Sequence, residues 1–170
     1  QIEYAGQDGQ YQAGVPRDFA LVTFGSEDVE RWVTIDRATG LMWQYSYSST
    51  QLFWEDALAY CEELDLAGFS DWRLPNIFEL ATLANYGHSG LPVTYRDYFL
   101  WKRPETGEWF YDLWSATPSY YSLFGPGVCA WSHDAKIGHA SVEGFQGWDP
   151  YARAVRRIQP GDLEMVGLTE

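Results

Sequence analysis

One stretch of the chain decides its fold: residues 53–83 read FWEDALAYCEELDLAGFSDWRLPNIFELATL. In the first half, apolar residues recur three and four positions apart, which is the spacing of one face of a helix. These residues are Trp54, Ala57, Leu58, Cys61 and Leu64. The pattern predicts an amphipathic helix over about residues 52–64, with the acidic residues lying off the apolar stripe.

The second half predicts another helix, beginning at Pro75 or Asn76. Asn76 is followed three positions later by Glu79, which is the spacing of a capping box, and proline is tolerated in the first turn. The buried stripe of this helix is expected to consist of Ile77, Leu80, Ala81 and Ala84.

The two helices are joined by SDWRLPN at residues 70–76. Trp72 is expected to pack inward. Arg73 is expected to form a partly buried ion pair, with Asp71 or with a carboxylate distant in sequence. Both expectations give this segment a structural role.

Short strands are predicted on either side of the two helices. Alternating and β-branched patterns indicate strands at about residues 31–36, 41–45, 109–116, 128–133, 140–145 and 152–158. Two strands, two helices and then a run of strands favour an α+β fold over a doubly wound parallel sheet. We expect an irregular N-terminal arm over residues 1–30, one domain over residues 31–160 and a loosely held tail over residues 161–170.

The composition indicates a folded chain with exposed aromatic residues. The 170 residues include nine Trp, twelve Tyr and nine Phe, more rings than one small core easily buries. Exposed Trp and Tyr suit the binding of sugars, peptides or protein partners. The net charge of −13 disfavours nucleic acid and anionic membranes as partners. The same carboxylates leave calcium open as a cofactor, with Asp134, Glu143 and Asp149 as the candidate ligands.

The sequence shows no apolar run of the ~20 residues that a membrane-spanning helix needs, so no membrane insertion is expected. It begins at Gln1 and shows no signal peptide, which suggests a processed or trimmed chain. Its two cysteines, Cys61 and Cys129, are compatible with one disulfide, with free thiols or with core residues.

Several segments together resemble the Lcl C-terminal domain family, exported bacterial domains named after a collagen-like adhesin. The resemblance rests on ATGLMWQ at 38–44, WEDALAYCEEL at 54–64, LAGFSDWRLPNIFEL at 66–80, LWSAT at 113–117, AWSHD at 130–134 and YARAVR at 151–156. GQDGQYQ at 6–12 is similar to a segment that often precedes this domain. The resemblance implies a C-type-lectin-like fold, in which two helices flank a small twisted antiparallel sheet and long loops carry the ligand surface. It also implies a periplasmic, secreted or cell-surface location.

The chain departs from the family pattern at Ala154, where the family often has a cysteine that would be the partner of Cys61. The resemblance therefore leaves two alternatives, a Cys61–Cys129 disulfide or two free thiols. A second departure is GSEDVERWVTID at residues 25–36, which stands where the family commonly has an Asp- and Gly-rich turn.

No catalytic constellation stands out in the sequence. A nucleophilic pair of Cys129 and His133 is conceivable, but nothing in the spacing fixes its geometry. The formylglycine-generating enzymes, which this family resembles at a distance, use paired cysteines in the C-terminal half, whereas this chain has only Cys129 there. Zinc spacings and phosphate-binding loops are also missing from the sequence.

We therefore expect a non-catalytic recognition module that binds a glycan or a protein through its aromatic C-terminal loops. The candidate ligand-binding residues are Trp101, Trp109, Tyr111, Tyr120, Tyr121, Phe124, His133 and Trp148. The alternatives are a structural or assembly subunit of an extracellular complex, in which the chain could form an oligomer, and an enzyme of the formylglycine-generating type.

Overall fold

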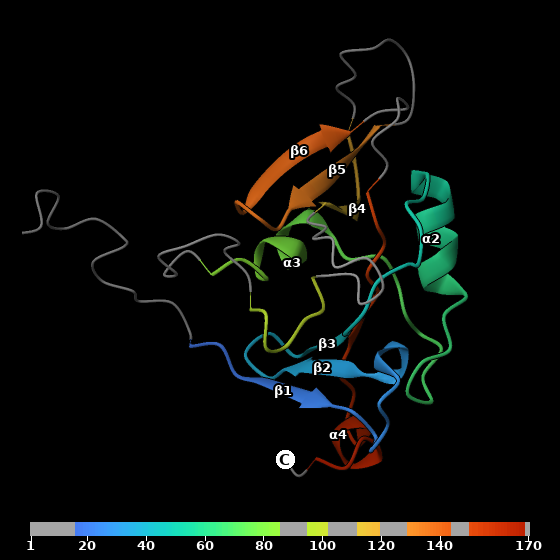
Figure 1. Ribbon diagram of the computed structural model, residues 1–170, viewed down its shortest axis with the longest axis vertical. Coiled ribbons are helices and arrows are strands. Elements are labelled where there is room, and N and C mark those ends of the chain that lie inside the picture. Colours follow the sequence, from blue (N-terminus) through green and yellow to red (C-terminus); the bar gives the residue numbers. More distant parts are fainter. Residues whose placement is uncertain (1–15, 86–94, 102–111, 120–128, 144–149, 169–170) are drawn as a thin grey trace, which may run out of the picture.

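The structure is a computed structural model and describes residues 16–85, 95–101, 112–119, 129–143 and 150–168. Its elements in chain order are β1 (Phe19–Val22), the 3₁₀ helix η1 (Val29–Arg31), β2 (Val33–Asp36), β3 (Leu41–Gln44), α2 (Trp54–Glu62), α3 (Ile77–Ala81), β4 (Asp112–Ser119), β5 (Cys129–Asp134), β6 (His139–Glu143), β7 (Val155–Arg157) and α4 (Asp162–Met165). This is the predicted α+β class. The strands form two small antiparallel sheets, where the prediction had one (Figure 1).

The first sheet has the strand order β1-β2-β3-β7. Its central hairpin joins β2 to β3 through the predicted RATG turn. Asp36 holds this turn by accepting hydrogen bonds from the Ala38 amide at 3.1 Å and the Thr39 hydroxyl at 2.7 Å. Gly40 has a φ of 69°, a conformation that glycine adopts without steric cost.

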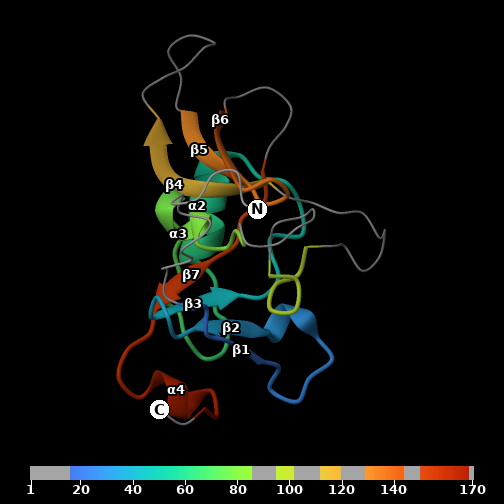
Figure 2. The ribbon, with the colours of Figure 1, turned by 90° about the vertical axis from the view of Figure 1, so that its left-hand side faces the viewer.

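The second sheet has the order β4-β5-β6, and β4 contains a register shift between Trp114 and Pro118. The turn between β5 and β6 is stabilised by Asp134, whose carboxylate accepts a hydrogen bond from the Lys136 amide at 2.7 Å. Figures 1 and 2 show α3 between this sheet and the first sheet, and Figure 1 shows α2 along one side of the two sheets.

Helix α2 is shorter at both ends than the predicted range of 52–64. Its buried residues, Ala57 and Cys61, belong to the predicted apolar stripe. Trp54 anchors its first turn, because the indole Nε1 donates to the Ser115 carbonyl at 2.8 Å.

The predicted capping box of α3 is confirmed. Asn76 Oδ1 accepts from the Glu79 amide at 2.9 Å, and Glu79 Oε2 accepts from the Asn76 amide at 2.8 Å. The predicted inward packing of Trp72 is confirmed as well, since its side chain is buried. Arg73 forms its ion pair with Glu79, at 2.6 Å between Nη2 and Oε1, and not with Asp71. The capping carboxylate therefore also fixes the arginine that precedes the helix.

Both faces of the first sheet are buried. Successive residues of a strand point to opposite faces, and every residue of β2 and β3 is buried. On one face Met42 joins a cluster with Cys61 and Trp72, and on the other Trp43 joins a cluster with Leu80 and Phe99. The sheet is therefore the middle layer of the core, with α2 packed against one face and α3 against the other.

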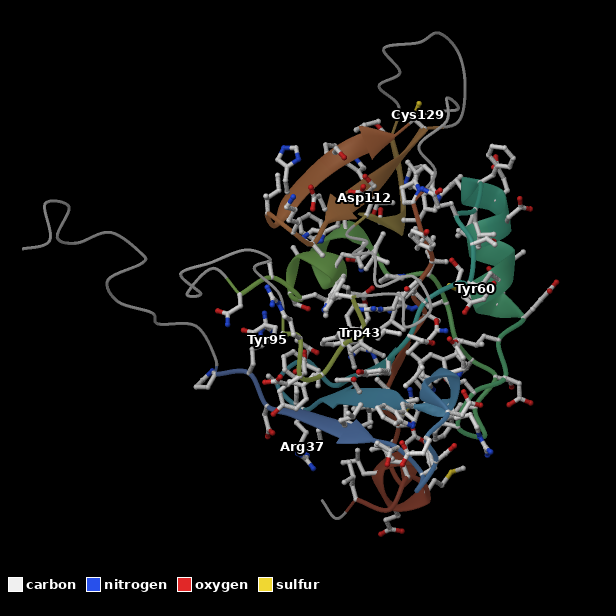
Figure 3. All side chains as sticks on the ribbon, in the orientation of Figure 1. Arg37, Trp43, Tyr60, Tyr95, Asp112 and Cys129 are labelled. Carbon is white, nitrogen blue, oxygen red and sulfur yellow. The ribbon has the colours of Figure 1, made fainter. Side chains whose placement is uncertain are left out.

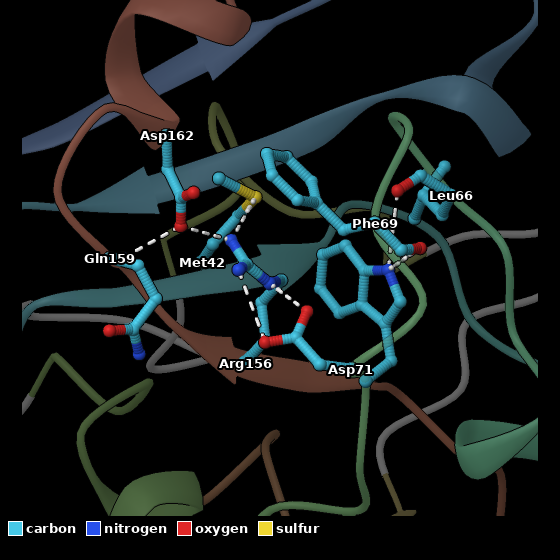
Figure 4. Close-up of polar contacts among 8 residues, drawn as sticks. Met42, Leu66, Phe69, Asp71, Arg156, Gln159 and Asp162 are labelled. Carbon is cyan, nitrogen blue, oxygen red and sulfur yellow. Dashed lines mark hydrogen bonds and ion pairs between the residues drawn. The ribbon is translucent and has the colours of Figure 1, made fainter.

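Arg156 on β7 is buried and ties three distant segments together (Figure 4). Its Nε donates to Asp71 Oδ1 at 2.5 Å, its Nη1 donates to Asp162 Oδ2 at 2.6 Å, and its guanidinium carbon lies 3.9 Å from the Phe69 ring centroid. The hydrogen bonds from Arg156 lower the pKa of Asp71. The arginine thus connects the loop between the helices to the C-terminal segment.

The two ends of the described chain are attached to the domain. Strand β1, within the expected arm, pairs with β2 and forms an edge of the first sheet. Residues 161–168 were expected to be loosely held. They instead contain α4, with Asp162 and Val166 buried and Leu163 packed on the core.

Candidate functional site

The second sheet determines where the C-terminal segments leave the fold. Ser119 pairs with Cys129, and Ala130 pairs with Glu143. The connection 120–128 and the segment that follows β6 therefore depart from the same end of the sheet, which is marked by Cys129 in Figure 3.

The other end of this sheet receives the chain from residues 102–111. There Asp112 pairs with Asp134, and Asp134 pairs with His139. The two ends are separated by the eight residues of β4, or roughly 20–25 Å at the rise of an extended strand. A ligand that contacts both ends would have to extend over the whole sheet.

This arrangement divides the predicted ligand-binding residues into groups. Four belong to the two segments at the Cys129 end: Tyr120, Tyr121, Phe124 and Trp148. Two others, Trp109 and Tyr111, precede Asp112 at the opposite end. All six lie outside the described residues, so their grouping follows from the chain path alone.

Trp101 was expected on the ligand surface, but it is 2% exposed. It lies in the segment 95–101, which packs against the first sheet through Phe19 and Trp43. The Leu100 amide donates to the Tyr45 carbonyl at 3.1 Å, which holds the segment in place. The prediction is therefore wrong for Trp101, because tertiary packing buries this ring in the core.

Arg153 explains much of this packing, and the sequence interpretation had not singled it out. It is fully buried, and its guanidinium carbon lies 4.3 Å from the Trp101 ring centroid and 5.2 Å from that of Phe99. It donates to the carbonyl oxygens of Ser46, at 3.0 Å, and Leu100. Burial lowers its pKa to about 9. The sequence offered one signal for this role: Arg153 stands within the otherwise apolar stretch YARAV, which indicates a buried strand. A charge buried there requires specific partners.

His133, another predicted ligand contact, is 1% exposed. Neither ring nitrogen has a hydrogen-bond partner among the described residues, and burial lowers the pKa of His133 to about 4, so the ring is neutral at pH 7. The prediction of a surface role is wrong for His133. The conceivable pair with Cys129 does not form either, because four residues along a strand span roughly 13 Å.

The motif TGLMWQ ends in a buried glutamine with several partners. Gln44 Nε2 donates to the Tyr60 hydroxyl at 2.7 Å and to Ser46 Oγ at 3.2 Å, while its Oε1 accepts from the Ala154 amide at 3.1 Å. Burial raises the pKa of Tyr60 to about 12. Gln44 thus joins β3 to α2 and to the segment preceding β7, which ties together three of the recognised motifs.

The family model of the Lcl C-terminal domain matches residues 32–156. The chain belongs to the Lcl C-terminal domain family. The match extends from the start of β2 to Arg156, so it includes the second sheet and excludes β1 and α4. No curated protein and no solved structure gave a match to this chain.

The cysteines of this Lcl C-terminal domain are both free and buried, so the structure contains no Cys61–Cys129 disulfide. Cys61 lies on α2 and Cys129 begins β5. Burial raises the pKa of the Cys61 thiol, which keeps it protonated. Ala154 is a member of the same buried cluster as Cys61, which agrees with the expected position of the family's cysteine.

The predicted calcium ligands do not form one site within the described residues. Asp134 ends β5 opposite His139, and Glu143 lies at the far end of β6, four residues or roughly 13 Å along the strand from His139. Asp149 lies outside the described residues. Over the part of the chain that the structure describes, no group of three or more His, Cys, Asp or Glu residues could hold a metal ion.

A last observation concerns membranes. Among the described residues, no helix is both long and apolar enough to cross a bilayer.

Proposed function

We propose that this Lcl C-terminal domain is an exported, non-catalytic recognition module with a C-type-lectin-like fold. It binds a glycan or a protein through residues 120–128 and 144–149. The observation that supports the proposal most is the register of β4, β5 and β6, which starts both segments from one end of a rigid sheet.

The chemistry of these two segments suits recognition. They contain Tyr120, Tyr121, Phe124 and Trp148, together with four glycines and one serine. Aromatic rings with polar tips supply contact area at a low cost in conformational entropy, while small residues let the backbone adapt. A rigid scaffold that presents variable segments is a common arrangement for binding sites.

The ligand is expected to be neutral or cationic, because the chain carries a net charge of −13. Polyanionic glycans would be repelled at low salt by this field. Neutral glycans and basic or apolar protein surfaces are therefore the ligand classes that the proposal favours.

The test is a glycan array and a pull-down from extracellular extract, each with and without a calcium chelator. The variant Tyr120→Ala/Tyr121→Ala/Trp148→Ala is expected to lose binding. The control Phe53→Ala/Phe78→Ala removes two exposed rings on the helices and is expected to bind normally. Loss in Trp109→Ala/Tyr111→Ala alone would instead place the ligand at the opposite end of the sheet.

Light scattering on the same samples separates recognition from an assembly role. A monomer that retains ligand binding supports the proposal. A stable oligomer that binds no ligand in either screen would favour the structural alternative.

A further inference from the structure

A pocket lies between the loop after β1 and the loop after α2, and its described lining includes no residue of the second sheet. Its volume is about 370 Å³, within the usual range for small-molecule sites. The first loop contributes Phe24, Glu30 and Arg31, and the second contributes Asp65, Ala67 and Gly68. None of these residues was a candidate ligand-binding residue in the sequence interpretation.

Two tight turns form the opposing walls of the pocket. In one, the Ser26 amide donates to the Thr23 carbonyl at 3.0 Å, around Phe24 and Gly25. In the other, the Phe69 amide donates to the Leu66 carbonyl at 3.1 Å, around Ala67 and Gly68. All four central residues have positive φ, as in type I′ turns.

Nothing among the described residues gives Phe24 a structural reason to occupy its position. Its φ is 52°, a conformation that costs a bulky side chain free energy and that Asn or Gly adopts readily. Burial does not offset this cost, because the residue is 41% exposed and belongs to neither core cluster. A strained and exposed aromatic residue on a pocket wall is therefore best explained by contact with a ligand.

The wall that carries Phe24 is held in one conformation. The Trp32 indole donates to the Ser26 carbonyl at 2.7 Å, and the Asp28 amide donates to Ser26 Oγ at 3.1 Å. Asp28 in turn caps η1 by accepting from the Glu30 amide at 3.1 Å. Because these bonds fix the loop before any ligand arrives, little ordering entropy is lost on binding.

The charges of the pocket select the class of ligand. Glu30 and Asp65 are acceptors, Arg31 is a donor, and none of the three has an ion pair with a described residue. Glu30 Oε2 also accepts a hydrogen bond from Ser46 Oγ at 2.7 Å. An anion would be opposed by two carboxylates, and a cation would be opposed by the guanidinium. Adjacent hydroxyl groups can both donate to carboxylates and accept from arginine.

We propose that this pocket is a second binding site, independent of the C-terminal segments, for one neutral sugar ring stacked on Phe24. The hydroxyl groups of the sugar donate to Glu30 and Asp65 and accept from Arg31. The other face of the ring lies toward the turn at Ala67. The pocket therefore admits a monosaccharide or the terminal residue of a glycan.

The test uses the whole chain and saturation-transfer NMR with D-glucose, D-galactose and N-acetyl-D-glucosamine. At least one of the three is expected to bind with a dissociation constant of about 1–10 mM. This affinity is expected to be the same between about 0.05 and 0.5 M NaCl, because a neutral ligand is not screened. Choline and D-glucuronate serve as cationic and anionic probes.

The decisive variant is Phe24→Asn, which removes the ring and suits the positive φ, so it is expected to fold at least as stably. Sugar affinity is expected to fall about tenfold, and Asp65→Asn is expected to weaken it as well. Phe53→Ala, which removes another exposed aromatic residue, is expected to bind as the unaltered chain does.

The proposal is overturned if none of the three sugars binds, if Phe24→Asn binds them unchanged, or if only choline or D-glucuronate depends on Phe24. Sugar binding that is lost only in Tyr120→Ala/Tyr121→Ala/Trp148→Ala also overturns it, and would support the C-terminal segments instead. Sugar binding that is lost in Phe24→Asn and kept in that triple variant supports this pocket. The proposed role of residues 120–128 and 144–149 is then decided separately, by the glycan array and the pull-down described above.

Discussion

Arg153 lies with its guanidinium carbon 4.3 Å from the ring centroid of Trp101, in the interior of the domain. Cation–π contacts and two backbone carbonyls stabilise this charge, and no described carboxylate pairs with it. The segment that ends at Trp101 is the last described part of the chain before Asp112. Arg153 therefore anchors the segment 95–101 in the core.

We predict that Arg153→Ala destabilises the domain by about 3 kcal/mol. The substitution leaves a cavity and removes the donors to the Ser46 and Leu100 carbonyls. Urea unfolding measures the change. Arg37→Ala is the control, because Arg37 only forms an exposed pair with Asp18 at 3.3 Å and should change stability by less than about 0.5 kcal/mol. Similar stabilities for the two variants would contradict an anchoring role.

The second prediction concerns Arg156. Its replacement by Met leaves the buried carboxylate of Asp162 without its ion pair, so we expect a loss of about 3 kcal/mol or more. The neighbouring Arg157 is exposed, and Arg157→Met should therefore be close to neutral. Thermal unfolding of both variants is the measurement. Protease sensitivity at residues 159–168 should rise only in Arg156→Met, because Asp162 holds that segment.

The helices could be predicted from the sequence better than the pairing of the strands. The apolar stripe of α2 and the capping box of α3 depend on local spacing, so both could be predicted. Strand pairing depends on contacts distant in sequence, such as Met42 with Arg156, and alternation does not say which strands are neighbours. The single sheet that was expected came from the family resemblance, and the structure has two.

The residues of the candidate sites were harder to predict from the sequence than the helices. Whether an aromatic residue is exposed depends on contacts that are distant in sequence. Trp101 follows a loop and is nevertheless buried against Arg153. Phe24 lies in the expected N-terminal arm and is exposed. The positive φ of Phe24 can be suspected from the sequence only because Gly25 follows it, as in a tight turn. This signal is weak, since many Phe-Gly pairs occur outside such turns. A pocket between two turns some forty residues apart cannot be inferred from either turn alone.

The third prediction uses the buried histidine. Burial lowers the pKa of His133 from 6.5 to about 4, so between these values the unfolded chain binds more protons than the folded one. Stability should therefore fall as the pH drops from 6.5 to 4, by roughly 3 kcal/mol from this group.

Replacement of His133 by Leu should remove that pH dependence and leave two fewer buried nitrogens without a partner. The measurement is the free energy of unfolding at several pH values between 4 and 7, compared with the unaltered chain. His139→Gln, at an exposed neighbouring position, should retain the slope. An equally steep slope in His133→Leu would show that other groups cause it.

The last prediction concerns the family's missing cysteine. Cys61 on α2 and Ala154 before β7 are both fully buried in one cluster, and Gln44 holds the two segments together through Tyr60 and the Ala154 amide. We expect Ala154→Cys to form a disulfide with Cys61 under oxidising conditions. Closing a loop of this length should stabilise the fold by about 4.7 kcal/mol at most, less any strain.

Mass spectrometry after alkylation and the midpoint of thermal unfolding with and without reductant test this prediction. Ala152→Cys is the matched control, since Ala152 is buried in the same cluster but lies two positions from the family's cysteine. Two alkylated thiols at Cys61 and position 154 in the oxidised, denatured variant would show that the segments are too far apart. A bridge confined to Ala154→Cys would show that this domain keeps the family's geometry after losing the bond, with its stability supplied by the Gln44 hydrogen bonds instead.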